Sequence, residues 1–442
     1  MASEPVTLRT EAEAHLLASY DLVRDKLPGS AKVRHHRATA IESFRNTGLP
    51  HRRVEAWHYT DLRALLRSVP PIGRDSNEEA VRRMLAEDSL GKLDHARIVI
   101  ADGGYRPDLS DAQGLPGIEV VSLADALQQG DPRIGSLFND DIEATVALNS
   151  ALMAGGVVVR VAPGASVARP IRIAHLQTGS EPAAVYVRNV VDVGAAARVS
   201  LWESHSGVPG VGHHANIVSE WLVGGRATVK AARLQASDAR AVHIVSLFVA
   251  VADDAIFEQA SLATGSAIAR AQTFVKLAGE GARASLSGAT LLDGERRSDT
   301  AIVIEHLKPA TTSRVLFRSA VDGRGEGAFQ GKVIVAEGAQ KADGKLGSKA
   351  LLLSDDASFS AKPELEIYAD DVQCGHGSTT GKIDTDHLFY LLSRGIPRAE
   401  AEQLLIAGFL AEAVEAIDDR GLIAALQPSV ESWLAGRGQG KG

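Results

Sequence analysis

The stretch AAVYVRNVVDVGAAARVSLWE, residues 183–203, carries the pattern that decides the fold. Two runs rich in valine and other strand-forming residues flank the small-residue spacer at residues 194–197. β-branched and aromatic residues favour extended backbone, whereas a cluster of small residues between two such runs is typical of a turn. The stretch therefore predicts two short β-strands joined by a tight connection.

The same succession of strand and turn extends from Gly155-Gly156 to about Val372, with almost no helical pattern. The clearest further runs are VVVRVAPG, RPIRIAH, NIVSEWLV, ATVKAARL, VHIVSLFVAV, AIVIEHL, SRVLFRSAV and GKVIVAE. A β-sandwich, a propeller and a β-helix all fit such a series. A run of roughly 200 residues is long for one sandwich, and no WD or kelch signature recurs. The pattern thus leaves the sandwich and the stacked β-helix open.

Helical patterns flank this β region on both sides. Apolar residues at helical spacing predict a helix that ends at Pro28-Gly29, and a second helix covers residues 33–44. Residues 96–101 predict a strand, residues 119–128 a strand that leads into a helix, and residues 140–153 a helix. Residues 384–434 predict C-terminal helices, the second opened by Pro397.

These patterns divide the chain into four expected parts. We expect a mostly helical α/β domain at residues 1–154, a β core at 155–372, a helical domain at 373–436 and a disordered tail at 437–442.

Composition narrows the functional classes. The 442 residues carry a net charge of -8, which argues against a non-specific nucleic-acid binder. A single cysteine, Cys374, allows neither an intramolecular disulfide nor a Cys-rich zinc site. No signal-type apolar run opens the chain, and no stretch approaches the ~18 apolar residues of a membrane helix. A cytoplasmic location without membrane contact is the expectation.

The most informative segment for chemistry is ELEIYADDVQCGHGSTTGKIDTDHLFYLLSRGIP, residues 364–397. A predicted strand is followed by Cys374 and His376 around one glycine, then by a Gly-Ser-Thr-Thr-Gly turn and a helix. Thiolate and imidazole are both good ligands for iron or zinc. Two ligands do not close a tetrahedral site, so a metal role requires ligands from a second chain; a buried cysteine beside a hydrogen-bonded histidine is the ordinary alternative.

Other catalytic signatures are weak. The run from Gly377 to Ile383 is one residue short of a phosphate-binding loop and has isoleucine where serine or threonine would hold magnesium, so no ATP binding by this chain is expected. No G-x-S-x-G elbow or dinucleotide fingerprint occurs in strand-to-helix context. A β-helix enzyme acting on carbohydrate is a rival, but the 5% aromatic content argues against sugar platforms. His306, Arg314, Arg318 and Lys332 punctuate late strands and could line one outward face.

Three segments resemble the SufB/SufD family: VEAWHYTDLRALL (54–66), LNSALMAGGVVVRVAPGASVARPI (148–171) and ADDVQCGHGSTTGKIDTDHLFYLLSRGI (369–396). They occur in the family's order, and the resemblance spans roughly residues 40–420. The Cys-x-His-Gly arrangement is the SufD-like form, and no cysteine lies near residues 347–353, where SufB-like chains carry one. ADGKLGSKALLL (342–353) departs from the family pattern in being richer in glycine and lysine.

The resemblance implies a mainly β fold, with a right-handed parallel β-helix core between an N-terminal, mostly helical α/β domain and a C-terminal helical domain. It also implies a non-enzymatic scaffold that assembles iron–sulfur clusters in a complex of one SufB, one SufD and two SufC ATPases.

The resemblance further implies site residues. His376, with Cys374 second, would be a ligand for iron or the nascent cluster, shared with a SufB cysteine. The C-terminal helices would dock SufC through Leu405, Phe409 and Leu410. A reduced flavin is implied as a cofactor of the complex, with no residues assigned to it. The rival reading is a homo-oligomeric interaction protein without a metal role, and a homodimer is one expectation for the chain alone.

Overall fold

The structure is a computed structural model that describes residues 9–73, 76–138, 143–416 and 420–437. The N-terminal part is mixed, as predicted from the sequence. Its helices and strands are α1 (Glu11–Val23), α2 (Ala31–Thr47), α3 (Leu62–Leu65), α4 (Glu78–Glu87), β1 (Ala96–Ala101), β2 (Gly104–Tyr105), β3 (Ile118–Ser122), α5 (Leu123–Gln129) and α6 (Ala144–Leu152). Short 3-10 turns lie at Arg24–Lys26, Glu55–Trp57, Ser89–Lys92, Pro107–Leu109 and Ala112–Gly114.

Sixteen strands follow one another without an intervening helix. They are β4 (Val157–Val161), β5 (Ile171–Gln177), β6 (Ala184–Val193), β7 (Arg198–Gly207), β8 (His214–Val223), β9 (Thr228–Gln235), β10 (Val242–Val251), β11 (Ile256–Ala263), β12 (Ile268–Leu277), β13 (Arg283–Leu292), β14 (Arg297–His306), β15 (Thr312–Val321), β16 (Glu326–Val335), β17 (Asp343–Leu352), β18 (Ser358–Ile367) and β19 (Gln373–Gly381).

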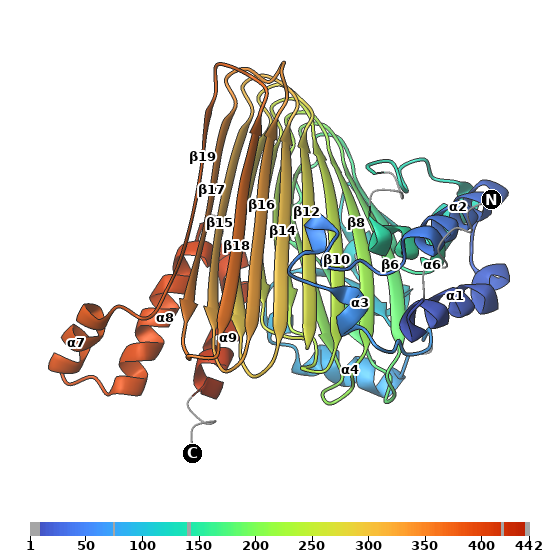
Figure 1. Ribbon diagram of the computed structural model, residues 1–442. Helices are drawn as coiled ribbons and strands as arrows, with labels where there is room; N and C mark the ends of the chain where they lie inside the picture. Colours follow the sequence, from blue (N-terminus) through green and yellow to red (C-terminus); the bar gives the residue numbers. More distant parts are fainter. Residues whose placement is uncertain (1–8, 74–75, 139–142, 417–419, 438–442) are drawn as a thin grey trace, which may run out of the picture.

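Successive strands alternate between two sheets, which makes the core a parallel β-helix (Figure 1). The odd-numbered strands from β5 to β19 belong to a ten-stranded sheet, and the even-numbered strands from β4 to β18 belong to a nine-stranded sheet. Each strand pairs in parallel with the strand two places on; Val187, for example, lies opposite Ile217. The sandwich left open by the sequence pattern is therefore wrong, and the predicted β-helix is confirmed.

The turns that lead from the even sheet to the odd sheet share a conformation. Ala196, Arg226, Asp254, Ala310 and Lys341 all have φ between 54° and 63°. In each turn one residue in the left-handed region reverses the chain within a few positions. Non-glycine residues rarely adopt a positive φ, so its repetition marks a shared turn type. The repeated turn keeps consecutive coils in register.

A single apolar core runs through the β-helix, formed by inward-facing residues of both sheets such as Ile173, Ile217, Phe257 and Val333. Each coil covers the apolar edge of the next, so the stack buries its core without a helix inside it.

The N-terminal part closes one end of this stack. β1 extends the odd sheet by pairing in parallel with β5, and β3 pairs antiparallel with β4. The segment around Trp57 lies against the even sheet: the Arg270 guanidinium stacks 4.7 Å from the centre of the Trp57 ring, and Thr60 Oγ1 donates to Asp299 at 2.8 Å. The E-x-W-x-Y-T-D segment therefore fastens the N-terminal helices to the β-helix.

Three helices follow the β-helix: α7 (Thr385–Ser393), α8 (Arg398–Val414) and α9 (Arg420–Arg437). The turn predicted at residues 377–381 is wrong, because this segment is part of β19, which pairs in parallel with β17. The β-helix thus extends past the expected boundary at residue 372. The start of the helix expected at 140–153 and most of the expected tail lie outside the described residues. No helix of the described part is long and apolar enough to cross a membrane.

Candidate functional site

The end of the β-helix opposite the N-terminal helices is open (Figure 1). β18 and β19 are the last strands of their sheets, so each has a neighbour on one side only. Their residues are exposed or half-buried throughout, unlike the central strands. Unpaired N–H and C=O groups along such edges can accept a strand from another chain.

The two open edges differ in composition. β18 contains Pro363 among Lys362, Glu364 and Glu366, and proline and charged residues on an edge strand discourage pairing with other chains. β19 has the sequence QCGHGSTTG, with neither proline nor a formally charged carboxylate, lysine or arginine. β19 is therefore the edge that is left competent for pairing.

Cys374 and His376 both lie on β19, two residues apart, and so on one face of the strand. Their register partners on β17 are Gly344 and Leu346. Because Leu346 belongs to the apolar core, this face is the inner one. Cys374 is half-buried against the core, whereas His376 is exposed because no further coil covers it.

Gly344 leaves room beneath the cysteine. A Cβ at Gly344 would lie 3.4 Å from Cys374 Sγ and 3.4 Å from Ser313 Oγ. Ser313 Oγ in turn lies 2.8 Å from His306 Nε2. Burial lowers the pKa of His306 to about 4, so its ring is neutral at physiological pH. A polar pair thus lies below the thiol, inside the end of the β-helix.

The structure brings Cys374 and His376 together but adds no third protein ligand. Among the described residues no group of three or more His, Cys, Asp or Glu side chains is arranged to hold a metal ion. The remaining coordination positions of any metal at this edge would come from outside the described chain.

The four residues expected to share an outward face do not do so. His306 is interior, as described above. Arg318 is buried and bonds Glu412 of α8 at 2.5 Å, whereas Lys332 lies in the other sheet and pairs with Glu366 at 2.5 Å. Of the four, Arg314 alone remains on the partly exposed outer face of the odd sheet, where it pairs with Asp343 at 2.5 Å. That expectation is wrong because consecutive strands alternate between sheets.

The predicted SufC-docking residues lie on α8, which packs against the outer face of the odd sheet. Leu410 is 0% exposed, Leu405 is half-buried, and the Phe409 ring centre lies 5.5 Å from the Arg318 guanidinium. Packing within the chain therefore uses Leu410 and Phe409, and their docking role stays a prediction.

The exposed apolar side chains of the C-terminal helices lie nearby. Phe389 and Tyr390 of α7 are 72% and 56% exposed, and Leu404 of α8 is 50% exposed. These three side chains, called here the C-terminal apolar surface, are the exposed large apolar residues in the described part of the C-terminal helices.

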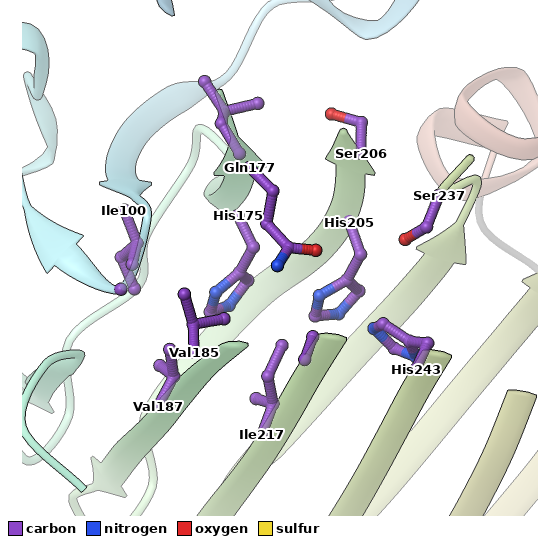
Figure 2. Close-up of a pocket in the computed structure, with 13 residues that line it drawn as sticks. Ile100, His175, Gln177, Val185, Val187, His205, Ser206, Ile217, Ser237 and His243 are labelled. Carbon is purple, nitrogen blue, oxygen red and sulfur yellow. The ribbon is translucent and has the colours of Figure 1, made fainter. Parts of the chain in front are cut away.

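A second polar cluster, which the sequence did not reveal, lies inside the other half of the β-helix. Figure 2 shows His175 of β5, His205 of β7 and His243 of β10 around one small cavity. His175 and His205 stack with ring centres 4.6 Å apart, and His243 meets His205 edge-on at 4.8 Å. His175 and His205 are direct register partners in consecutive coils. A search for histidines at equivalent positions of successive strands could have found this pair.

Burial controls the charge of this cluster. Loss of hydration lowers the pKa of His175 and of His243 to about 3 and lowers that of His205 in the same direction. Nδ1 of His175, both ring nitrogens of His205 and Nε2 of His243 have no hydrogen-bond partner among the described residues, whereas Nε2 of His175 lies 3.3 Å from the side-chain nitrogen of Asn189. The rings stack instead of converging on one point, so their arrangement is that of neutral core residues and not of a metal site.

Comparison with known proteins agrees with this architecture. A family model described as "SUF system FeS cluster assembly, SufBD core domain" matches residues 175–409, and one described as "SufBD protein N-terminal region" matches residues 11–173. The iron-sulfur cluster assembly protein SufD of Escherichia coli is 32% identical over 390 residues, which cover 86% of this chain and 88% of the relative.

Two further relatives carry related descriptions. An iron-sulfur cluster assembly SufBD family protein of Synechocystis is 28% identical over 396 residues, 86% of each chain. SufD of Bacillus subtilis is 28% identical over 303 residues, covering 66% of this chain and 67% of the relative. The family resemblance predicted from the sequence is confirmed: the chain belongs to the SufBD family of iron–sulfur cluster assembly proteins, on its SufD side.

Proposed function

We propose that this chain is a non-enzymatic scaffold subunit that pairs with SufB through β19 and contributes His376 to the binding of iron or of a nascent cluster at that contact. The observation that carries the proposal is the position of Cys374 and His376 on the one open edge strand that lacks proline and formal charge. A strand of SufB added along β19 would bring its own side chains next to both residues.

The chemistry of the two side chains supports an iron cargo. Imidazole and thiolate bind iron, and ligands from two chains can complete a site that neither chain closes alone. His376 is the more accessible of the two, and we assign it the main role. Cys374 is half-buried over Gly344 and would reach the cargo only from the inner side of the coil.

Partner docking would use the C-terminal helices. The C-terminal apolar surface of Phe389, Tyr390 and Leu404 presents large apolar side chains to solvent, as an interface anchor does. We propose that SufC binds there, in a complex of one SufB, one SufD-like chain and two SufC subunits. ATP hydrolysis would be the work of SufC, and a reduced flavin of the complex would bind at residues that we do not assign. The proposed location is the cytoplasm.

The test is co-expression of the tagged chain with SufB and SufC of its host, anaerobic purification and quantification of bound iron. The variant is His376→Ala, and His35→Ala on the exposed face of α2 is the matched control. We expect a co-purifying complex in which His376→Ala loses most of its iron and His35→Ala loses none. Equal iron in all three complexes would reject His376 as a ligand, and the absence of any complex would reject the scaffold role.

A second candidate is a homo-oligomer without a metal role, because a second copy of the chain could also pair along β19. It predicts a stable dimer of the chain alone, and retention of that dimer as the only assembly when SufB is present. Sedimentation velocity with and without SufB separates the two functions.

A further inference from the structure

A groove of about 620 Å³ opens on the outer face of the odd sheet. Helix α8 crosses this sheet and covers outer residues such as Ala289 and Ala320, which join its apolar contact. The helix ends before it reaches the first halves of β13, β15 and β17, where the groove lies beside Ala416. Small-molecule sites commonly occupy 300–1,000 Å³, so the space is of the right size for one.

The floor of the groove is bare backbone. Gly347 and Gly375 line it, and neither has a positive φ that would require glycine. A Cβ at Gly347 would have its nearest neighbour at 3.7 Å, and one at Gly375 would have its nearest at 4.0 Å. A Cβ would therefore fit at both positions, so packing within the chain does not require glycine at either of them. Their absence of side chains leaves a flat surface open.

The rim of the groove is cationic. Arg314 is held by Asp343, whereas Lys345 forms no ion pair with any residue in the described part of the chain. The Lys345 ammonium lies over the floor, 4.0 Å from the position that a Cβ of Gly375 would take. Ser287, which is nearly fully buried, also lines the groove, and its hydroxyl has no hydrogen-bond partner among the described residues. An uncompensated cation and an unused hydroxyl both favour an anionic ligand.

The side wall is apolar. Leu316 lines the groove between Arg314 and the glycine floor. Lys345 and Gly347 belong to residues 342–353, the segment that departs from the SufB/SufD pattern in its glycine and lysine content. The proposed scaffold role makes no use of this departure, which supplies Gly347 of the floor and the Lys345 cation.

We propose that this groove binds a small anion with a flat apolar body, of the size of a mononucleotide. The flat body lies on the backbone at Gly347 and Gly375 against Leu316, and the anionic group is held by Lys345 and Arg314. The groove needs no partner chain, but it adjoins the proposed SufB contact, because Gly375 and His376 of β19 are among the residues that line it.

The test uses the isolated full chain and the fluorescent probe 8-anilinonaphthalene-1-sulfonate, which combines a flat apolar body with one anion. We expect one saturable site per chain. Gly347→Val fills the floor and Lys345→Glu reverses the charge, and each should weaken binding at least tenfold. Near-ultraviolet circular dichroism checks that both variants keep the native fold. If Gly347→Val does not fold, the result for Lys345→Glu alone decides the test.

Two matched controls accompany these variants. Gly338 has no neighbouring atom within 4 Å of the position that a Cβ would take and does not line the groove, and Lys341 lies on a turn outside it, paired with Asp371. Gly338→Val and Lys341→Glu should leave the affinity unchanged. Equal weakening by the controls, or full affinity in Lys345→Glu, would overturn the proposal.

Competition defines the ligand class. We expect AMP to displace the probe, and inorganic phosphate or adenosine alone to fail. Displacement by phosphate alone would show that the flat body plays no part, and displacement only by an acidic peptide would identify a protein-docking groove instead. Either result would overturn the proposed ligand. None of these measurements includes SufB, SufC or iron, so their failure leaves the scaffold proposal standing.

Discussion

The histidine cluster inside the β-helix should make the fold sensitive to mild acid. His175 and His243 are buried, and loss of hydration lowers the pKa of each to about 3. In the unfolded chain a histidine has a pKa of about 6.5. Since the unfolded state then binds more protons between these two values, stability is complete above about pH 6.5 and is lost as the pH falls toward 3.

The magnitude follows from the same numbers. Between pH 7 and pH 5, each of these two histidines should lower the free energy of unfolding by about 2 kcal/mol, or about 4 kcal/mol together. That is a large part of the ~5–15 kcal/mol that stabilises a typical domain. His205 acts in the same direction, because burial also lowers its pKa.

Two charged neighbours belong to the same interior. Burial raises the pKa of Glu203, which opposes the histidines as the pH falls, and burial lowers the pKa of Arg233. A comparison of variants cancels both contributions, because these neighbours are present in every protein compared.

The assay is urea unfolding, followed by tryptophan fluorescence at pH 7 and pH 5. The perturbation is the double variant His175→Leu/His243→Leu, with His35→Leu on the surface as its control. We expect the double variant to lose about 4 kcal/mol less than the wild type between the two pH values, whatever its stability at pH 7. An equal loss in wild type and double variant would refute the reasoning that these rings are neutral because they are buried.

Three further predictions, each with a comparison variant, concern the packing of the helices and the docking of SufC. Arg318→Met should lower the free energy of unfolding by about 1–3 kcal/mol, because it removes the contacts to Glu412 and Phe409. Arg324→Met, which breaks an exposed ion pair, should lower it by less than about 1 kcal/mol. Thermal melts of both variants check this, and equal effects would contradict it. Trp57→Ala should lower the free energy of unfolding, measured by urea titration, by about 3–5 kcal/mol, since the indole is buried under Arg270. Tyr59→Ala, at a partly exposed position, should lower it far less. A small effect at Trp57 would mean that the segment does not fasten the helices. Phe389→Asp should reduce the affinity for SufC at least tenfold in a pull-down titration without changing the melting temperature. Leu410→Asp, at a buried position, should lower the melting temperature itself. Unchanged affinity in Phe389→Asp would reject the C-terminal apolar surface as the docking site.

The sequence pattern predicted the succession of strands and turns well because its signal is local and repeated, whereas the choice of a β-helix over a sandwich rested on the family resemblance. Each coil repeats the same strand and turn composition, so an error at one strand does not change the assignment of the others. β19 was missed because QCGHGSTTG has the small and polar residues of a turn. Its strand conformation comes from pairing with β17, a tertiary effect that outweighs local preference.

The candidate site was predictable only in part, for a related reason. Cys374 and His376 stand out because they are chemically distinctive, and their spacing places them on one face of any strand. The helical spacing of α8 does not show which of its apolar sides faces the sheet. The sequence therefore does not indicate that Leu410 is buried and Leu404 exposed. The histidine cluster depends on the register between β5 and β7, which no single stretch of sequence contains.

The two ends of the β-helix are unequal, and this has a consequence for how many molecules can join. At the N-terminal end the edge strands β2 and β3 have only 2 and 5 residues, while β18 and β19 have 10 and 9. A molecule with two long bare ends would stack head to tail into a fibre, because each addition would expose a fresh template. With only one such end, the first association consumes the template and growth stops at a pair. The unequal ends of the monomer therefore limit the assembly of β-helices along this axis to two molecules.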